Sequence, residues 1–356
     1  MAPRIRLAFI GGEHLHFQGL LASALASPTA DVVGMSIADD ELRDFFVRRH
    51  PDVPAFAEAE ELYDKAKPEA IVTCADNRRA ASVVADAARR GVHVMKEKPM
   101  AADVALAEEM ATVTARHGVR LMVNWPTNWH GGIHTAKQLV EAGEIGRVLG
   151  IHNRAGHGGP PEDFAGTGPI GRVGWGWLIE RSANGGGAAV DFCSYGAVMS
   201  RWFMGQPSNV TAHGGRYSKD FFTVEDNGIM ILGYPRGHSV IEGTWTQPAV
   251  PVRQPTMIYG EKGAIALTGP DEVAVANLGS SGELVSTASR TVTADKLPDH
   301  YRSGPDYFTH CLLNDEPFEG MVTPEISRDA QEILDAGLRS MVSGQRVGLP
   351  LPTFSH

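Results

Sequence analysis

The sequence predicts an α/β protein of two domains: a doubly wound parallel sheet, followed by an α/β domain with a large, open, mainly antiparallel sheet. Short apolar segments alternate with helical segments over the first third of the chain, whereas many later segments alternate apolar and polar residues. With 356 residues, the chain is also too long for a single hydrophobic core. We place the domain boundary between residues 124 and 125.

The first domain, residues 1–124, is predicted from a regular succession of strands and helices. Its first strand, Ile5–Ile10, is a mostly apolar run that ends at two glycines, as a buried parallel strand entering a turn should. Short connections between the segments favour a parallel sheet with helices on both faces. The segments that follow are a helix at 17–26, a strand at 31–37, a helix at 41–50, a strand at 70–74, a helix at 79–90, a strand at 92–95, a helix at 106–116 and a strand at 121–123.

The second domain, residues 125–356, begins with a predicted helix at 133–142. Further on, two pairs of strand-like segments surround turn sequences and predict hairpins. The glycine- and proline-rich segment 156–176 is expected to be a flexible loop or a lid. A long final helix, at 324–342, is a candidate to pack back on the first domain. The hairpin strands are 227–232 with 238–243, and 256–259 with 264–267.

The composition of the chain excludes several classes of protein. The formal net charge of −10 argues against a nucleic-acid partner and against a polybasic membrane contact, because both need a positive surface. No apolar run is long enough to span a bilayer or to form the core of a signal peptide. The cysteines, Cys74, Cys193 and Cys311, are far apart and odd in number, so neither a disulfide framework nor a zinc site is expected. We therefore expect a cytoplasmic protein without a metal site.

A candidate phosphate-binding loop, residues 11–16, lies between the first strand and the first helix. An open α/β sheet binds the pyrophosphate of a dinucleotide at this place, because free N–H groups at the helix N-terminus favour phosphate. The loop reads G-G-E-H-L-H, so a glutamate and a histidine replace the second and third glycines of G-x-G-x-x-G. Histidine side chains can add donors to phosphate; the alternative is an ordinary tight turn. The expected cofactor contacts in this loop are Gly11, Gly12, His14 and His16.

The second strand should end near an acid that binds the adenosine ribose hydroxyls. Asp39 is the candidate, although it comes slightly late in the sequence for this role. No arginine follows directly to hold a 2′-phosphate, which favours NAD slightly over NADP as the cofactor. The alternative is that Asp39 and Asp40 simply cap the helix that follows them.

Lys98 follows the strand at 92–95 and should lie at the carboxyl edge of the parallel sheet, where open α/β sheets bind ligands. A lysine at this edge can support a developing alkoxide and lower the pKa of a neighbouring acid. Pro99 fixes the local backbone, and a cis bond before it would direct Lys98 into the cleft. The alternative is a solvated surface lysine, which is the usual state of a lone lysine.

Asp191 and Tyr195 lie four residues apart on a predicted helix that follows the glycine run 185–187, so they share one helix face. A carboxylate and a phenol on one face can bind an alcohol and move its proton. Alternatively, Asp191 favours the helix N-terminus and Tyr195 packs in the core. The aromatic residues Trp125, Trp129, Trp175 and Trp177 could stack on a sugar ring, although core packing suits most of them better, and His157 either contacts substrate or belongs to a loop.

Several short motifs, in this order and at this spacing, are typical of one protein family. They are G-V-H-V-M-K-E-K-P at 91–99, D-N at 76–77, G-E-I-G at 143–146, the G-G-G run with Asp191 at 185–191, G-E-K-G at 260–263 and S-G-Q-R-V-G-L-P at 343–350. Together they resemble the Gfo/Idh/MocA family, that of glucose–fructose oxidoreductase, inositol dehydrogenase and the rhizopine-catabolism proteins. The resemblance extends over nearly the whole chain.

The resemblance implies an N-terminal Rossmann domain that binds NAD or NADP, and a C-terminal domain whose open sheet often forms the oligomer interface. A homodimer or homotetramer is therefore expected. The catalytic lysine of the family falls on Lys98 and its acid on Asp191, whereas Tyr195 stands where many members have histidine. Further expected cofactor contacts are Asn77, Glu97 and Lys98. The expected substrate contacts are Lys98, Asn124, His157, Trp175, Asp191 and Tyr195.

The favoured function is transfer of a hydride between NAD(P) and a hydroxyl-bearing carbon of a sugar, polyol or glycoside. In this hypothesis Tyr195, with its pKa lowered by Lys98, accepts the hydroxyl proton, Asp191 orients the sugar hydroxyls and Glu97 anchors the nicotinamide ribose. One alternative is a glycoside-cleaving enzyme that uses NAD for a transient oxidation without net redox change. Another is a non-catalytic regulator that binds NAD(P) or sugar.

Overall fold

The computed structural model describes residues 3–247, 249, 254–277 and 289–352 of the chain. The chain divides into two compact units, each discontinuous in sequence. The sequence alone does not predict that 160–187 and 298–328 belong to the first unit. Unit 1 comprises Met1–Trp125, Pro160–Gly187 and Pro298–Arg328, and unit 2 comprises Pro126–Gly159, Ala188–Leu297 and Asp329–His356.

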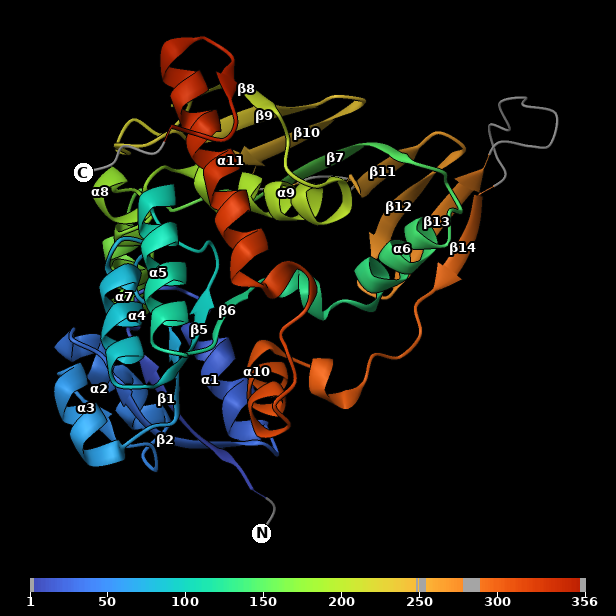
Figure 1. Cartoon of the computed structure of the whole chain (residues 1–356). Coiled ribbons are helices and arrows are strands. Elements are labelled where there is room, and N and C mark those ends of the chain that lie inside the picture. Colours follow the sequence, from blue (N-terminus) through green and yellow to red (C-terminus); the bar gives the residue numbers. More distant parts are fainter. Residues whose placement is uncertain (1–2, 248, 250–253, 278–288, 353–356) are drawn as a thin grey trace. The chain divides into compact units, whose positions relative to one another are not determined.

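Unit 1 is built on a six-stranded parallel sheet in the order β3-β2-β1-β4-β5-β6 (Figure 1). Since β1 pairs with β2 on one side and with β4 on the other, the strand order reverses between β1 and β4. Open α/β sheets bind ligands beyond the carboxyl ends of the strands at such a point. The strands are β1 (Ile5–Ile10), β2 (Ala30–Ser36), β3 (Ala55–Phe56), β4 (Ala70–Thr73), β5 (His93–Glu97) and β6 (Leu121–Asn124).

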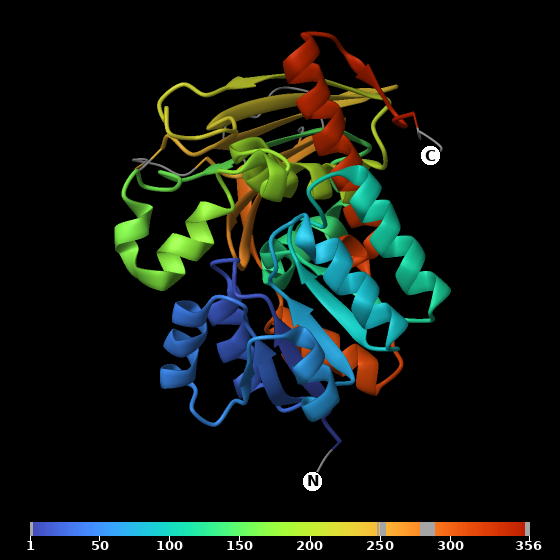
Figure 2. The same cartoon turned by 90° about the vertical axis from the view of Figure 1, so that its left-hand side faces the viewer.

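Helices cover both faces of this sheet: α4 lies beside α5 on one face, and α1 lies beside α10 on the other (Figures 1 and 2). The strand residues between these layers, among them Leu7, Phe9 and Ile71, have no exposed surface. The helices are α1 (Phe17–Ala26), α2 (Asp40–Arg49), α3 (Ala59–Ala66), α4 (Arg79–Arg89), α5 (Val104–Arg116), α7 (Gly168–Gly176), α8 (Arg181–Asn184) and α10 (Gly304–Leu313), with short 3₁₀ turns η2 (Phe164–Thr167), η3 (Asp299–Tyr301) and η4 (Gly320–Val322).

Unit 2 contains a nine-stranded, mostly antiparallel sheet in the order β14-β13-β12-β11-β7-β10-β9-β8-β15. Only the pairing of β7 with β10 is parallel among the described strands. The helix α9 (Ala188–Met204) packs on β7, β9 and β10, and α6 (Gly131–Glu141) packs on β12 and β13. The strands are β7 (Val148–Gly156), β8 (Asn209–Gly215), β9 (Asn227–Tyr234), β10 (Gly237–Thr244), β11 (Thr256–Gly260), β12 (Gly263–Gly269), β13 (Glu272–Asn277), β14 (Ser289–Thr293) and β15 (Val347–Gly348).

The second sheet has one covered face and one open face. Along β9 the buried residues Met230 and Leu232 alternate with the exposed Ile229 and Ile231, which is the pattern of a half-covered antiparallel strand. The 3₁₀ turn η1 (Pro126–Trp129) precedes α6, and the last helix, α11 (Pro324–Ser343), begins in unit 1 and continues in unit 2.

The structure confirms the alternation of strands and helices in the first sheet and both predicted hairpins, β9–β10 and β11–β12. Gly91, Gly118 and Gly143, which follow α4, α5 and α6, all have a positive φ, as glycines that end helices often do. Within the described ranges, no helix combines the length and the apolar character that crossing a membrane requires.

Of the two alternatives for 156–176, the flexible loop is wrong, because this segment contains η2 and α7, whereas the lid stays a prediction. Its glycines allow close packing. A Cβ at the buried Gly174 would lie 2.3 Å from the side chain of Leu15 and 3.4 Å from the carbonyl oxygen of Glu13. A glycine-rich sequence therefore forms a helix here, since larger side chains would not fit against the loop of residues 11–16.

Candidate active site

Three consecutive charged residues lie at the carboxyl edge of the parallel sheet: Lys96 and Glu97 end strand β5, and Lys98 follows it. All three are buried, with 0%, 0% and 2% of their surface exposed. The idea that Lys98 is an ordinary solvated surface lysine is therefore wrong. The Lys98 N–H donates to the Asn124 carbonyl at 3.2 Å, and the peptide bond between Lys98 and Pro99 is cis.

Lys96, which the sequence analysis did not single out, belongs to a buried polar network. Its Nζ donates to Asn77 Oδ1 at 3.2 Å, and Asn77 Nδ2 donates to Asn184 Oδ1 at 2.8 Å. The predicted cofactor residue Asn77 is therefore held by two side chains of unit 1. Burial lowers the pKa of Lys96 from 10.5 to about 8, although the Glu97 carboxylate opposes this shift.

The lowered pKa of Lys96 predicts a rise in stability with pH. Between about pH 8 and pH 10 the unfolded chain keeps the proton of this lysine while the folded chain releases it, so the free energy of unfolding rises across this window. From about pH 7.5 to pH 9.5 the gain should be about 2 kcal/mol. Urea unfolding of the wild type and of Lys96→Met at both values measures it. Lys96→Met should lose the gain, whereas Lys65→Met, which removes an exposed lysine of α3, should keep it. Equal pH slopes in all three proteins would contradict the shift.

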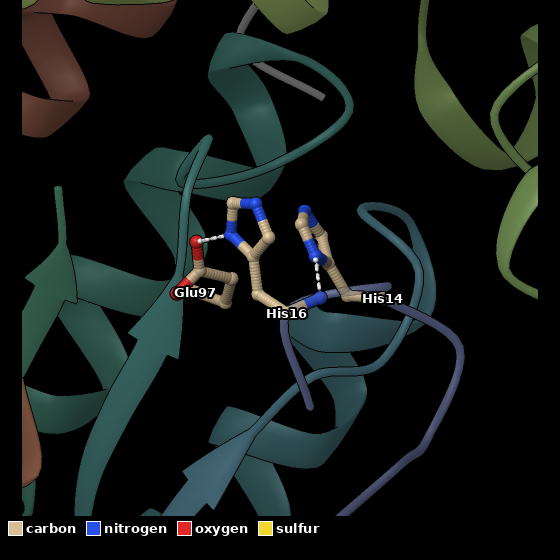
Figure 3. Close-up of side chains that lie close together, drawn as sticks. All are labelled: His14, His16 and Glu97. Atoms are coloured by element: carbon tan, nitrogen blue, oxygen red, sulfur yellow. Dashed lines mark hydrogen bonds and ion pairs between the residues drawn. The ribbon is translucent and has the colours of Figure 1, made fainter. Parts of the chain in front are cut away.

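The carboxylate of Glu97 joins three elements of unit 1. Its Oε2 accepts a hydrogen bond from Asn124 Nδ2 at the end of β6, and its Oε1 lies 2.8 Å from His16 Nδ1 at the start of α1 (Figure 3). The structure thus brings together three residues that the sequence analysis singled out separately. Glu97 and Asn124 are paired in the β5–β6 register, which explains their contact.

The turn at the end of β1 packs tightly against the end of β4. Gly11 has φ of +81°, and a Cβ there would lie 2.7 Å from the backbone nitrogen and 2.8 Å from the Cα of Ala75, which follows β4. Only glycine lets the two strand ends come this close. Glu13, in place of the second glycine, is neutralised by Arg79, whose Nη1 lies 2.8 Å from its Oε1. Burial raises the pKa of Glu13, against the effect of Arg79.

His14 is buried beside the edge of β5. Its Nδ1 accepts a hydrogen bond of 3.1 Å from the His16 N–H, and Trp177 covers its ring at a centroid distance of 5.7 Å. Burial, followed by the charges of His16, Lys98 and Lys96, holds the pKa of His14 well below its usual value of 6.5. His14 is therefore neutral at physiological pH, and its environment includes Lys98.

Asp39 is the N-cap of α2, as the alternative prediction had it: its Oδ1 accepts from the Leu42 N–H at 2.9 Å. It is also paired with Arg172 of α7, whose Nη2 lies 2.9 Å from both carboxylate oxygens. Burial raises the pKa of Asp39, but the Leu42 N–H and Arg172 outweigh it and leave the pKa below its usual value. The arginine that the local sequence lacks thus comes from a segment 133 residues away.

Arg172 should affect the choice between NAD and NADP. If Asp39 binds the adenosine ribose as predicted, an arginine beside it can hold the 2′-phosphate of NADP and offset its repulsion by Asp39. We therefore expect Arg172→Ala to weaken NADP binding about tenfold while NAD affinity changes less than about threefold. Calorimetric titration of both dinucleotides measures this, with Arg43→Ala on α2 as a control because Arg43 already bonds Asp40 and the Ile37 carbonyl. Equal losses for NAD and NADP would exclude a role in selectivity.

Unit 2 carries the second group of predicted site residues. Asp191 and Tyr195 share one face of α9, as predicted, and Asp191 Oδ2 accepts from the indole nitrogen of Trp245 at 3.1 Å. The rings of Tyr195 and His157 both pack on Phe192, at 6.2 and 4.9 Å between centroids. These contacts bring three of the predicted residues together within unit 2. Their meeting with Lys98, which belongs to unit 1, stays a prediction.

The tryptophans have different roles. Trp125 is buried and donates to Ser327 Oγ at 3.0 Å, and Trp177 donates to the Glu13 carbonyl at 2.9 Å, so core packing holds for both. Trp175, the predicted substrate contact, is half-buried on α7. Glu13, Arg79 and Arg172 were not predicted as site residues. The ion pairs Arg79–Glu13 and Arg172–Asp39 join residues far apart in the sequence, so no local pattern indicates them. The burial of Lys96 likewise has no local signal in the sequence.

Two family models match the chain. Residues 5–125 match the model described as oxidoreductase family, NAD-binding Rossmann fold, and residues 133–266 match the GFO/IDH/MocA C-terminal domain. Among curated proteins, D-xylose 1-dehydrogenase [NADP(+)] of Haloarcula marismortui is 26% identical over 268 residues, 73% of this chain and 70% of the relative. The 2,7-anhydro-N-acetylneuraminate hydratase of Mediterraneibacter gnavus is 35% identical over 92 residues, which is 26% of this chain and only 25% of that protein.

The fold also matches solved structures. Aldose-aldose oxidoreductase from Caulobacter crescentus, complexed with glycerol, superposes with a TM-score of 0.79 at 19% identity, covering 97% of this chain and all of that chain. At this identity the likeness establishes the fold alone, whereas the two family models together match most of the chain. The chain therefore belongs to the Gfo/Idh/MocA family of oxidoreductases, and its first unit contains an NAD-binding Rossmann fold.

Proposed function

We propose that the protein is an NAD-dependent dehydrogenase that oxidises a hydroxyl group of a sugar, polyol or glycoside, with NADP as a second possible cofactor. The burial of Lys98 beside Glu97, at the carboxyl end of β5 in the NAD-binding domain, carries this proposal. A hydroxyl oxygen that loses its proton during oxidation develops negative charge, and an ammonium group at this edge of the sheet can stabilise that charge.

The predicted residues fall into three roles. NAD, when bound, supplies the acceptor for the hydride that leaves the hydroxyl-bearing carbon. In this proposal Lys98 holds the reacting oxygen, Tyr195 accepts the hydroxyl proton and Asp191 orients the sugar hydroxyl groups. The cofactor contacts are Gly11, Gly12, His14, His16, Asp39, Asn77 and Glu97, and the further substrate contacts are Asn124, His157 and Trp175.

The name of the H. marismortui relative, a D-xylose 1-dehydrogenase, supports a sugar substrate. The most direct test is NADH formation, followed by its ultraviolet absorbance, across inositols, aldoses and glycosides with NAD and with NADP. Absence of NADH with every compound, despite measurable NAD binding, would contradict the proposal and favour a non-catalytic regulator.

A second candidate is transient oxidation without net redox change, as in an enzyme that cleaves glycosides. The name of the M. gnavus relative, a hydratase, favours this candidate, although the match spans only a quarter of either chain. Cleavage of a glycoside with NAD present and no accumulation of NADH would identify it.

The open face of the second sheet supports a homodimer or homotetramer. Ile229 and Ile231 on β9, and Tyr259 on β11, expose 37%, 47% and 37% of their surface. Large apolar side chains on an open sheet favour association. Light scattering of the intact protein will give its mass, and a monomer at all concentrations would exclude this assembly.

A further inference from the structure

The carboxylate of Glu13 lies on the turn that is expected to receive the pyrophosphate of NAD. Glu13 stands at the second glycine position of the G-x-G-x-x-G pattern, where the absence of a side chain normally lets the backbone approach the pyrophosphate. Its side chain is largely buried, with 18% of its surface exposed. Its Oε2 lies 2.6 Å from the point that a Cβ of Gly11 would occupy. The loop therefore already holds an acidic group at this place.

The groups around this carboxylate are of the kind that binds phosphate. Burial, and to a smaller extent Asp76, raises the pKa of Glu13, whereas Arg79 and the backbone N–H groups of Glu13 and Gly12 act against this shift. Arg79 Nη1 lies 2.8 Å from Glu13 Oε1. Loop N–H groups and a guanidinium are also the donors that a pyrophosphate needs at such a turn. The carboxylate and the pyrophosphate thus require the same partners.

The N-terminus of α4, where Arg79 lies, is already capped. Asp76 Oδ1 accepts hydrogen bonds of 3.1 and 2.9 Å from the N–H groups of Arg78 and Arg79, so these two donors are used within the chain. Asp76 also places a second negative charge near Glu13. Arg79 therefore meets the Glu13 carboxylate with its side chain, and not with the N-terminus of its helix.

The ion pair between Arg79 and Glu13 is incomplete. An arginine and a carboxylate that are well matched frequently make two parallel hydrogen bonds. Here Glu13 Oε2 and Arg79 Nε are both buried, and neither has a hydrogen-bond partner within the described chain. A buried polar atom without a partner destabilises the folded protein. The Nε of Arg79 thus lacks an acceptor, which a phosphate oxygen can supply.

We propose that Arg79 is a ligand of the NAD pyrophosphate, and that Glu13 occupies the same anion site before the dinucleotide binds. When NAD enters, its pyrophosphate displaces the Glu13 carboxylate from Arg79 and from the loop N–H groups, and the carboxylate turns towards solvent. The side chain of Arg79 is 39% exposed, so it can reach a ligand while α4 stays folded. This inference rests on the cofactor site of the proposed function, and not on the reaction or the substrate.

Glu13 should therefore lower the affinity for NAD, because the pyrophosphate has to break its ion pair with Arg79. Glu13→Gln keeps the size of the side chain and removes its charge, so the Kd for NAD should fall about tenfold. Glu60→Gln is the matched control: it breaks an ion pair with Arg90 at the other end of α4 and should leave the Kd unchanged. Calorimetric titration measures both. An unchanged or raised Kd in Glu13→Gln would overturn the inference.

A double-variant cycle separates a pyrophosphate ligand from a counter-ion of Glu13. Arg79→Met should raise the Kd for NAD at least about tenfold in the wild type, and also in Glu13→Gln, where no carboxylate needs to be neutralised. The neighbouring Arg78→Met is the control and should leave the Kd unchanged, because Arg78 bonds Asp103 and the Ser182 carbonyl instead. If Arg79→Met has no effect in the Glu13→Gln background, Arg79 only neutralises Glu13 and the inference is wrong.

Fragments of NAD locate the contact on the cofactor. ADP-ribose contains the pyrophosphate and adenosine does not, so Glu13→Gln and Arg79→Met should change the affinity for ADP-ribose as they do for NAD and leave that for adenosine unchanged. Equal changes for adenosine would contradict the inference while leaving the dehydrogenase function intact. Absence of NAD binding by the wild type and by Glu13→Gln alike would instead contradict the cofactor site of the proposed function, and the inference with it.

Discussion

Replacing Lys98 by methionine should lower kcat about 1000-fold, or about 4 kcal/mol in the activation free energy, and leave the affinity for NAD within a fewfold of the wild type. Methionine preserves the length and burial of the side chain, which is 2% exposed, and removes only the charge. If Lys98 stabilises the oxygen that loses its proton, its contribution exists in the transition state and hardly at all in the cofactor complex. Steady-state kinetics and calorimetric titration with NAD separate the two effects.

Two controls make this result specific. Lys65→Met removes an exposed lysine of α3 and should leave both kcat and NAD affinity unchanged. Lys98→Arg keeps the charge but brings a planar, larger group into a buried position, so it should recover little of the lost activity. An equal loss of NAD affinity and kcat in Lys98→Met would instead make Lys98 a cofactor ligand.

Gly11→Ala should be the most damaging small substitution in the NAD-binding domain. The residue has φ of +81°, a conformation that costs an L-residue roughly 1–2 kcal/mol, and its new Cβ would lie 2.7 Å from the backbone nitrogen of Ala75. Since backbone cannot move aside as a side chain does, we expect a loss of about 3 kcal/mol in the free energy of unfolding. NAD affinity should fall about 100-fold because the loop shifts. Urea unfolding and NAD titration measure both.

Gly19 provides the matched control for this substitution. It lies on α1, eight residues after Gly11, and a Cβ there meets nothing within 4 Å. Gly19→Ala should therefore be neutral or stabilise the helix by about 0.5–1 kcal/mol. Similar behaviour of the two variants would show that the crossing at Gly11 is not tight.

The fold could be predicted largely from local pattern. Short apolar runs predicted the strands of the first sheet apart from β3, and turn sequences predicted both hairpins, because these signals lie within a few residues. The helix α10 was missed: its sequence does not indicate that it packs beside α1, since Thr29 and Thr309, whose hydroxyls are 2.7 Å apart, are separated by 280 residues. The prediction of a flexible loop at 156–176 failed for a different reason, because glycine is typical both of flexible loops and of closely packed helices.

The contacts of the site residues were even harder to predict from local sequence than the fold. The motif at 91–99 was enough to predict Lys98 and Glu97, but not that the Glu97 carboxylate would lie 2.8 Å from His16 Nδ1, 81 residues away in the sequence. In the same way, Asp39 was predicted without Arg172, because nothing local in the sequence indicates an ion pair between α2 and α7. Residue types could thus be assigned from sequence, whereas hydrogen-bond and ion-pair partners required the fold.

The central claim, NAD-dependent oxidation of a hydroxyl group at Lys98, is tested most directly by one measurement. Wild type and Lys98→Met are compared for NADH formation with a panel of inositols, aldoses and glycosides. We predict that the wild type forms NADH with at least one of these compounds, and that Lys98→Met forms it about 1000-fold more slowly with the same compound. NADH formation at equal rates by both proteins would contradict the account.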